Sequence, residues 1–395
     1  MTRRLFSGTG RLLTPRPRDA GDGAWALLVE HGRFTWVGEL ADAPAASSAD
    51  LVELGDALVT PGLVDAHTHP VYAGDRSDEA AARLSGEPYS GGGILRTVAA
   101  TRAATDDDLH GLIVTRLRAQ LAAGTTSVEC KSGYGLSTAE ELRALRLIGE
   151  VAAGLPIRVT RTFLGAHAVP PDSLDYTDAL VNEMIPGVAA ERAAEFCDVF
   201  CDAGFFSVAD AERILLAARA NGMGIRLHAD QLASIGAVQL AVRLGATSAD
   251  HLEQLNEAGV AALAASRTVA TLLPGPALVL RDRLPPARAL LDAGARVALA
   301  SDANAGTFGA WGAMPLVIGL GATLLGMSAL EAVAAATAGG AAALGLEGRR
   351  GVIAPGADAD LVAWDAEHEG AFALNLGAVR PRAIYLGGEA IPGST

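Results

Sequence analysis

The sequence predicts an α/β protein: a (β/α)8 TIM barrel with a small β-sandwich domain formed by both termini. Short apolar strands alternate with amphipathic helices from about Pro61 to Gly345, which is the pattern of parallel β/α units. Eight strand candidates lie in that range, the number that a closed barrel needs. Outside it, each end of the chain carries a few short strands, too few to bury a face alone.

We therefore expect a barrel domain over residues 59–349 and a composite small domain from residues 1–58 and 350–395. The eight strand candidates, in chain order, are GLVDAHTH, TTSVECK, IRVTRTFLGAH, FCDVFCDAG, GIRLHAD, ATSADHL, TVATLLP and RVALASD.

The segments between the strands carry helix signals. Ser137-Thr-Ala-Glu140 reads as a capping box that opens a helix ending at Gly154, and Ser207 can cap a run that ends at Gly222. Between residues 105 and 124 one apolar stripe marks a further helix, formed by Leu109, Leu112, Ile113, Leu117 and Leu121. We expect these helices to cover the barrel.

Composition limits the classes of partner. The formal charge of −14 would repel nucleic acid and anionic membranes, but it leaves room for a small acidic substrate that a local arginine captures. No run is long enough to span a membrane, and no apolar segment of signal-peptide length follows the basic start. Three cysteines without framework spacing favour a reducing cytoplasm. Alanine-rich helix faces leave a homodimer open.

Two histidines close the first strand candidate. In the stretch TPGLVDAHTHPV, Thr60 to Val71, His67 and His69 are separated by one residue. Successive side chains of a strand point to opposite faces, so both imidazoles face the same way. Two imidazoles directed at one point suggest a metal ion, although such a pair also occurs in ordinary surfaces and cores.

Similar groups follow other strand candidates. The active site of such a barrel lies at the carboxyl ends of its strands. These ends carry five of the eight histidines and one acid: His67, His69, His167, His228, His251 and Asp302. The remaining His31, His110 and His368 are expected on the surface. Imidazoles and a carboxylate around one ion, with a position open to water, are typical of a hydrolytic centre.

The residues at these strand ends resemble the amidohydrolase superfamily of metal-dependent barrels, through PGLVDAHTH, His228, His251 and ASDAN. More narrowly, the chain is similar to the imidazolonepropionase family of histidine degradation. The stretches that carry this similarity run from Gly62 to Thr307: DAHTHPVYAGDR, GGGILRTVAATRAA, GTTSVECKSGYGLSTAEELR, TFLGAHAVPPD, CDVFCDAGFFS, RLHADQL, GATSADHLE, ATLLPG and ALASDANAGT. Among them, KSGYGL and FLGAH are specific.

The resemblance implies hydrolysis of the cyclic amide C–N bond of 4-imidazolone-5-propanoate to N-formimidoyl-L-glutamate. It also implies one bound metal ion, Zn2+ or Fe2+/Fe3+, held by His67, His69, His228 and Asp302. The implied catalytic residues are His251, Asp302 and Gln231. The implied substrate contacts are Arg76, Tyr134, His167, Gln231, Asn304, Gly306 and Thr307.

The chemistry of some of these residues supports the roles. The planar guanidinium of Arg76 can bind a propionate bidentately. Tyr134 lies in a Gly-Tyr-Gly turn with no obvious core to join, which favours a pocket. Asn304 and Gly306 could instead be turn formers after the last strand. Cys130, Cys197 and Cys201 are expected to be small buried residues without a catalytic role.

Two features depart from the family pattern. Some relatives carry a glutamate where this chain has Gln231, and an amide cannot ionise, so proton transfer falls to His251 or to Asp302. We favour His251. The segment RLSGEPYSGGGIL, residues 83–95, is shorter than usual between its tyrosine and the glycine triplet, which predicts a shorter loop over the substrate.

Other amidohydrolases, including deaminases and dihydroorotase-like enzymes that act on a heterocyclic amide or amine, form the main alternative. Binuclear members use a carbamylated lysine after strand four, whereas the only lysine here, Lys131, ends strand two. Deaminases need a glutamate near His228, and Gln231 occupies that position. A non-catalytic relative of the barrel would be expected to lose ligands, and none of the four is missing.

Overall fold

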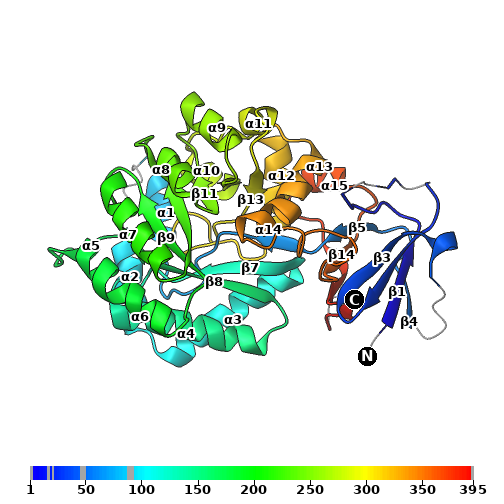
Figure 1. Ribbon diagram of the computed structural model, residues 1–395, viewed down its shortest axis with the longest axis horizontal. Helices are drawn as coiled ribbons and strands as arrows, with labels where there is room; N and C mark the ends of the chain where they lie inside the picture. Colours follow the sequence, from blue (N-terminus) through cyan, green and yellow to red (C-terminus); the bar gives the residue numbers. More distant parts are fainter. Residues whose placement is uncertain (1–2, 16–17, 20–21, 45–49, 87–92, 393–395) are drawn as a thin grey trace.

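The computed structural model describes residues 3–15, 18–19, 22–44, 50–86 and 93–392 of the chain. Figure 1 shows a barrel surrounded by helices beside a smaller β body that holds the first and last strands of the chain. One sheet has eight strands and two further sheets have four each. Most of the loop that the sequence predicts to be short, residues 87–92, lies outside the described residues.

The eight-stranded sheet is the barrel, and it confirms the eight strand candidates. Its strands pair in parallel and in chain order. They are β6 (Leu63–Asp65), β7 (Thr125–Lys131), β8 (Arg158–Ala166), β9 (Phe196–Cys201), β10 (Gly224–Ala229), β11 (Ser248–His251), β12 (Val269–Leu272) and β13 (Val297–Leu299). The first and last strands meet beyond their ends, where Thr68 and Ala303 form a parallel bridge.

A buried carboxylate reinforces this closing seam between β6 and β13. Asp65 Oδ1 accepts the backbone N–H of Ser301 at 2.9 Å, and Oδ2 accepts the Ser301 hydroxyl at 2.6 Å and the Gln120 amide at 2.8 Å. Burial raises the pKa of Asp65 to about 6 despite these donors. Asp65 therefore ties the first strand to the chain that leads into Asp302.

Helices follow the strands and cover the outside of the barrel (Figure 1). They are α1 (Ser77–Leu84), α2 (Gly93–Ala103), α3 (Asp106–Ala122), α4 (Thr138–Gly154), α5 (Tyr176–Ala179), α6 (Ile185–Ala190), α7 (Val208–Ala220), α8 (Ala237–Leu244), α9 (Glu257–Ala264), α10 (Pro274–Leu280), α11 (Ala287–Asp292), α12 (Met314–Thr323), α13 (Ala329–Ala334) and α14 (Gly340–Ala343). Two π-helical segments, η2 (Leu180–Met184) and η3 (Ala335–Gly339), join α5 to α6 and α13 to α14.

The predicted helix signals are confirmed, with one difference in capping. Ser207 accepts the backbone N–H of Asp210, and Ser137 accepts that of Glu140. The Glu140 carboxylate, however, does not return to Ser137 and pairs with Arg143 at 2.9 Å. The capping box of α4 is therefore only half formed, because an arginine one turn later competes for the acid.

Two four-stranded sheets form the small β body. One contains β1 (Arg3–Gly8), β2 (Trp25–Glu30), β3 (Arg33–Glu39) and β4 (Asp50–Glu53); the other contains β5 (Leu58–Pro61), β14 (Leu361–Trp364), β15 (Pro381–Leu386) and β16 (Glu389–Ala390). A short 3-10 turn, η1 (Leu40–Asp42), follows β3. Apolar side chains of both sheets, among them Phe6, Trp25, Leu361 and Tyr385, share one buried cluster. Neither sheet could bury this face alone.

The ends of the chain also contact the barrel. β5 runs from Leu58 to Pro61 and so crosses the predicted domain boundary after residue 58, which stays a prediction. A helix that the sequence patterns did not indicate, α15 (Gly370–Leu374), packs against α12. Within the described residues, no helix combines the length and the apolar character needed to cross a lipid bilayer.

Candidate active site

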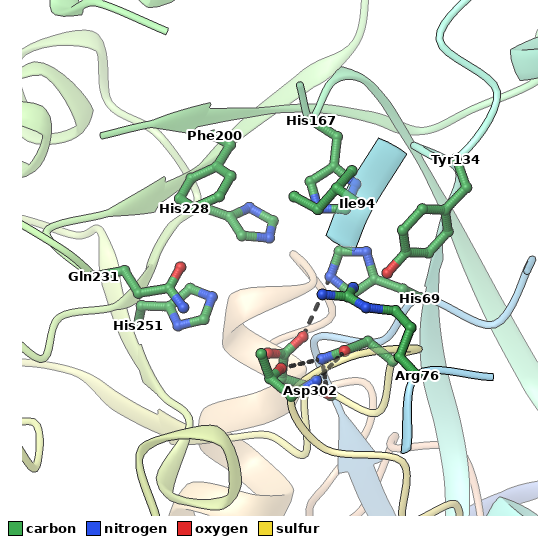
Figure 2. A pocket seen from close by; sticks show the side chains of 12 residues that line it. His69, Arg76, Ile94, Tyr134, His167, Phe200, His228, Gln231, His251 and Asp302 are labelled. Carbon is green, nitrogen blue, oxygen red and sulfur yellow. Dashed lines mark hydrogen bonds and ion pairs between the residues drawn. The ribbon is translucent and has the colours of Figure 1, made fainter. Parts of the chain in front are cut away.

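The histidines at the strand ends converge inside the mouth of the barrel. One ring nitrogen from each of His67, His69 and His228 lies within 4.8 Å of those of the other two. All three side chains are buried. Asp302, which follows β13, reaches the same point, with its Oδ1 3.3 Å from His69 Nε2 and 3.6 Å from His67 Nε2. Figure 2 shows His69, His228 and Asp302 facing one another across the pocket.

The donor set fits a metal ion. The Nε2 atoms of His67 and His69 are only 3.2 Å apart. His67 Nδ1 lies 2.7 Å from Asp250 Oδ2, so the ring proton is best held there and Nε2 carries a lone pair. Burial lowers the pKa of His67 and that of His228, which keeps both imidazoles neutral. Converging lone pairs beside a carboxylate are a site for a cation.

Asp302 supplies negative charge to this group of imidazoles. Burial alone would raise its pKa, but its hydrogen bond and charge interaction with His69 hold the pKa of Asp302 below its usual value. Its backbone φ of 49° is left-handed, an uncommon conformation for a residue other than glycine. The carboxylate is therefore held ionised and aimed at the histidines.

A network of buried charges lies behind the histidines. Lys131 Nζ is 2.7 Å from both Glu129 Oε1 and Asp198 Oδ2. Arg226 contacts Glu129 at 3.2 Å and Asp250 at 3.1 Å. Burial opposes the charge of Lys131, but Asp198 and Glu129 outweigh it and raise the pKa of the lysine. Lys131, the only lysine of the chain, is therefore charged and links Glu129 to Asp198 inside the barrel.

Two acids of this network connect it to the histidines. Asp250 meets His67 as described, and Asp198 Oδ2 lies 3.0 Å from His228 Nδ1. Burial alone would raise the pKa of Asp198, but its contacts with Lys131 and His228 hold that pKa well below its ordinary value. Each acid thus orients the imidazole in front of it. Sequence reasoning missed both, although an acid within an otherwise apolar strand is a signal that could have found them.

His251 lies beside the histidine cluster, its ring centroid 5.3 Å from that of His228 and 5.5 Å from that of His67. Its Nδ1 is 3.5 Å from Glu253 Oε1, and both side chains are buried. Burial opposes the imidazolium, yet the charge of Glu253 outweighs it and raises the pKa of His251. His251 is thus suited to hold a proton near neutral pH.

All the remaining predicted residues except Gly306 line one pocket in the mouth of the barrel, which is open to solvent. The predicted residues that line it are His69, Arg76, Tyr134, His167, His228, Gln231, His251, Asp302, Asn304 and Thr307, together with Ile94 and Phe200. Figure 2 shows them directed inward from several strands and loops. Gly306 is not among them; it lies behind Arg76 and lines a neighbouring pocket.

The loop that carries Tyr134 is held by a residue that sequence reasoning also missed. Glu141, on α4, accepts the backbone N–H groups of Gly133, Gly135 and Leu136 at 2.8 to 2.9 Å. Burial raises the pKa of Glu141. This buried acid, one residue after Glu140, fixes the Gly-Tyr-Gly turn and with it the tyrosine.

A similar arrangement fixes the loop of Gln231. Asp202, which follows β9, accepts the backbone N–H groups of Gln231, Leu232 and Ala233 at 2.8 to 3.0 Å.

The three cysteines are buried and form no disulfide, in agreement with their expected structural role. Burial raises the pKa of the Cys201 thiol to about 12, which removes its nucleophilic character.

Comparison with known proteins places this site in a family. The model of the amidohydrolase family matches residues 70–389. A curated imidazolonepropionase from Ralstonia nicotianae is 46% identical over 363 residues, covering 89% of this chain and 89% of that protein. One from Vibrio cholerae is 43% identical over 373 residues, covering 92% of each.

Solved structures share the architecture at much lower identity. N-isopropylammelide isopropylaminohydrolase from Burkholderia multivorans has a TM-score of 0.76 and 22% identity, covering 99% of this chain and 98% of that one. An adenosine deaminase from Xanthomonas campestris with bound zinc has a TM-score of 0.72 and 20% identity, covering 98% and 92%. At these identities the likeness shows the fold alone, and it confirms the predicted barrel.

Proposed function

The chain belongs to the amidohydrolase family and, within it, to the imidazolonepropionase family, and we propose that it hydrolyses the ring amide of 4-imidazolone-5-propanoate to N-formimidoyl-L-glutamate in histidine degradation. The observation that carries this proposal is the identity of 40 to 46% to curated imidazolonepropionases over about nine-tenths of the chain. The convergence of His67, His69, His228 and Asp302 supports a metal-dependent reaction.

These four residues would hold one metal ion. Three imidazoles and a carboxylate suit both Zn2+ and iron, so the donor set leaves the choice between them open. When bound, such an ion supplies Lewis acidity toward a carbonyl and lowers the pKa of water to about 7. Asp250 and Asp198 keep the imidazoles of His67 and His228 turned toward it.

Arg76, Tyr134 and His167 are the groups that would hold the substrate. Arg76 is the arginine that lines the pocket, and its guanidinium would bind the propionate. His167 Nδ1 lies 2.9 Å from the carbonyl oxygen of Gly133, so it donates there and presents Nε2 to the pocket. Gln231 and Thr307 offer neutral hydrogen-bonding groups to the ring nitrogens and oxygen. The recognition is thus polar around a flat ring.

Proton transfer falls to His251, as Gln231 cannot ionise. With Glu253 behind it, His251 can donate a proton to the departing ring nitrogen and stabilise negative charge on the carbonyl oxygen. Asp302 is the second candidate for accepting the proton of water, since its pKa is held low and its carboxylate is ionised. A deaminase would need an ionisable acid where Gln231 stands, which makes that alternative weaker.

The setting is also part of the proposal. Three buried thiols without a disulfide suit the reducing cytoplasm, where a catabolic enzyme for a small polar substrate would act. Association into a homodimer stays a prediction from the alanine-rich helix faces. Sedimentation of the purified protein would test it.

The deciding experiment follows the ultraviolet absorbance of 4-imidazolone-5-propanoate with metal-loaded protein. We expect rapid loss with wild type and loss near the spontaneous rate with His67→Ala, because truncation removes a ligand. His110→Ala, which changes a histidine on α3 that does not line the pocket, is the matched control and should keep full activity. Wild-type protein that holds metal but leaves the substrate intact would refute the assignment.

A further inference from the structure

The side chain of Arg76 is held along one edge by a neighbouring acid. Arg76 precedes α1, and Glu79 stands three residues later on the first turn. Arg76 Nε lies 3.1 Å from both oxygens of Glu79, and Nη2 lies 2.8 Å from Oε2. The side chain of Arg76 is only 4% exposed. The Nε–Nη2 edge of the guanidinium is therefore committed to Glu79.

Two glycines restrict the guanidinium further. A Cβ atom on Gly93, the first residue of α2, would come within 2.0 Å of Arg76 Nη2 and 2.3 Å of Cζ. A Cβ atom on Gly306 would come within 2.2 Å of Nη1 and 2.4 Å of Cζ. Any other residue at either position would push the guanidinium aside. Because these contacts involve the flexible end of Arg76, the substitution would move that side chain rather than the backbone.

Asn304 in turn holds Gly306 in place. Its Oδ1 accepts the backbone N–H groups of Gly306 at 2.7 Å and Thr307 at 2.9 Å. Its Nδ2 donates to the Asp302 carbonyl and to the Thr307 hydroxyl, both at 2.7 Å. These bonds use both donors and both acceptor sites of a carboxamide. Asn304 is thus occupied in building the turn between Asp302 and Thr307.

Two other arginines lie near Glu79 and limit how far it neutralises the charge of Arg76. Arg83 Nη1 and Arg96 Nη1 each lie 3.9 Å from a Glu79 oxygen, so three guanidinium groups share this acid. Arg83 also donates to the Gly306 carbonyl oxygen at 2.8 Å. Arg96 is itself paired with Asp78 at 2.7 Å. Glu79 is therefore not the partner of Arg76 alone.

We propose that Glu79, Gly93 and Gly306 form a clamp that holds the Arg76 guanidinium as a preset carboxylate receptor and so sets the preference for anionic over neutral imidazolones. The proposal rests on the proposed function, since it takes a substrate carboxylate to bind at Arg76. A guanidinium already fixed loses less conformational freedom when the carboxylate arrives. Glu79 and the two glycines are positioning residues that act through Arg76.

The test measures binding and needs no turnover. Titration calorimetry of metal-loaded protein would give dissociation constants for imidazole-4-propanoate and 4-ethylimidazole, which differ by the carboxylate. We expect wild type to prefer the acid by at least about tenfold, as a charge-assisted pair allows. Gly93→Ala and Glu79→Ala should each reduce that preference about tenfold, while Glu79→Gln, which keeps an acceptor, retains most of it.

Gly111→Ala is the matched control, because a Cβ atom at Gly111 on α3 would meet nothing within 4 Å. Its preference for the acid should equal that of wild type. In turnover experiments the clamp variants should raise KM with kcat nearly unchanged, since they weaken binding in ground and transition states alike.

A preference within twofold of wild type in both Gly93→Ala and Glu79→Ala would overturn the clamp, and so would a wild type without any preference. If Gly93→Ala fails to fold, Glu79→Ala decides alone, because Glu79 lies on a partly exposed helix. Failure of the proposed function has a different signature, because wild type would then not hydrolyse the imidazolone. The measured preference between the two ligands would still test the clamp, since that measurement needs no turnover.

Discussion

At the scale of single residues, the acids behind the histidines matter as much as the histidines. Asp250 and Asp198 contact the Nδ1 atoms of His67 and His228, and each is also paired with a buried cation, Arg226 or Lys131. A carboxylate in this position fixes the ring and increases the basicity of the opposite nitrogen. We therefore expect the affinity of the site for a metal ion to depend on Asp250 and Asp198 as well as on the proposed ligands.

We expect Asp250→Asn to weaken metal binding about 10- to 100-fold while the barrel stays folded, because asparagine keeps an acceptor but loses the charge. Competition with a chromogenic zinc chelator would measure the affinity. Asp360→Asn is the control: it removes a buried acid that is paired with Arg350, remote from the site, and should leave the affinity unchanged. Equal affinities for wild type and Asp250→Asn would contradict the role.

The sequence could predict the candidate ligands but not the acids that contact them. His67 and His69 follow from strand alternation, and His228, His251 and Asp302 follow from their positions at strand ends. Which acid faces which histidine depends instead on the closure of the barrel, which brings β11 behind His67 and β9 behind His228. Contacts between strands far apart in the chain leave no local pattern.

At the scale of elements, the seam between β6 and β13 is where the barrel closes. These strands meet through a bridge beyond their ends, and Asp65 adds three hydrogen bonds from Ser301 and Gln120.

Strand and helix positions were predictable because their periodicity is local. Glu141 and α15 were not predictable, because both depend on tertiary contacts. Glu141 is a buried acid that holds a loop. The short helix α15 is stabilised by packing against α12.

The titration of Asp65 gives the seam a pH dependence. Burial raises the pKa of Asp65 to about 6, above its value of 3.8 in the unfolded chain, so folding favours its protonated form. Its contribution to stability is full below pH 3.8 and is lost as the pH rises through about 6. Asp65→Asn removes this titration, so the destabilisation it causes should be about 1 kcal/mol larger at pH 5 than at pH 8.

Urea unfolding of wild type and Asp65→Asn at the two pH values would measure this difference. Titrations of other groups, which the two proteins share, cancel in the comparison. Asp107→Asn, which makes the same exchange at an exposed acid on α3, serves as the control and should have only a small effect on stability. A destabilisation by Asp65→Asn that is greater at pH 8 than at pH 5 would contradict the assigned direction.

At the scale of the whole molecule, the buried network around the histidines holds more acids than basic side chains. The four acids Glu129, Asp198, Asp250 and Asp302 face the two cations Lys131 and Arg226. A bound divalent cation would add positive charge beside these acids. Metal binding would therefore stabilise the fold, because an ion that binds only the folded chain stabilises it by mass action.

We expect removal of metal with a chelator to lower the unfolding temperature without loss of helical circular dichroism, because the strands and helices retain their own core. A free ion at a thousand times its dissociation constant stabilises the folded state by about 4 kcal/mol, which is a shift of several degrees. Calorimetry at one fixed scan rate would record it. Adding Zn2+ or Fe2+ should restore the temperature, whereas Mg2+ should not, because it prefers oxygen ligands to imidazole. Equal recovery with Mg2+ would mean that charge balance alone stabilises the barrel, and it would contradict the assignment of His67, His69 and His228 as ligands.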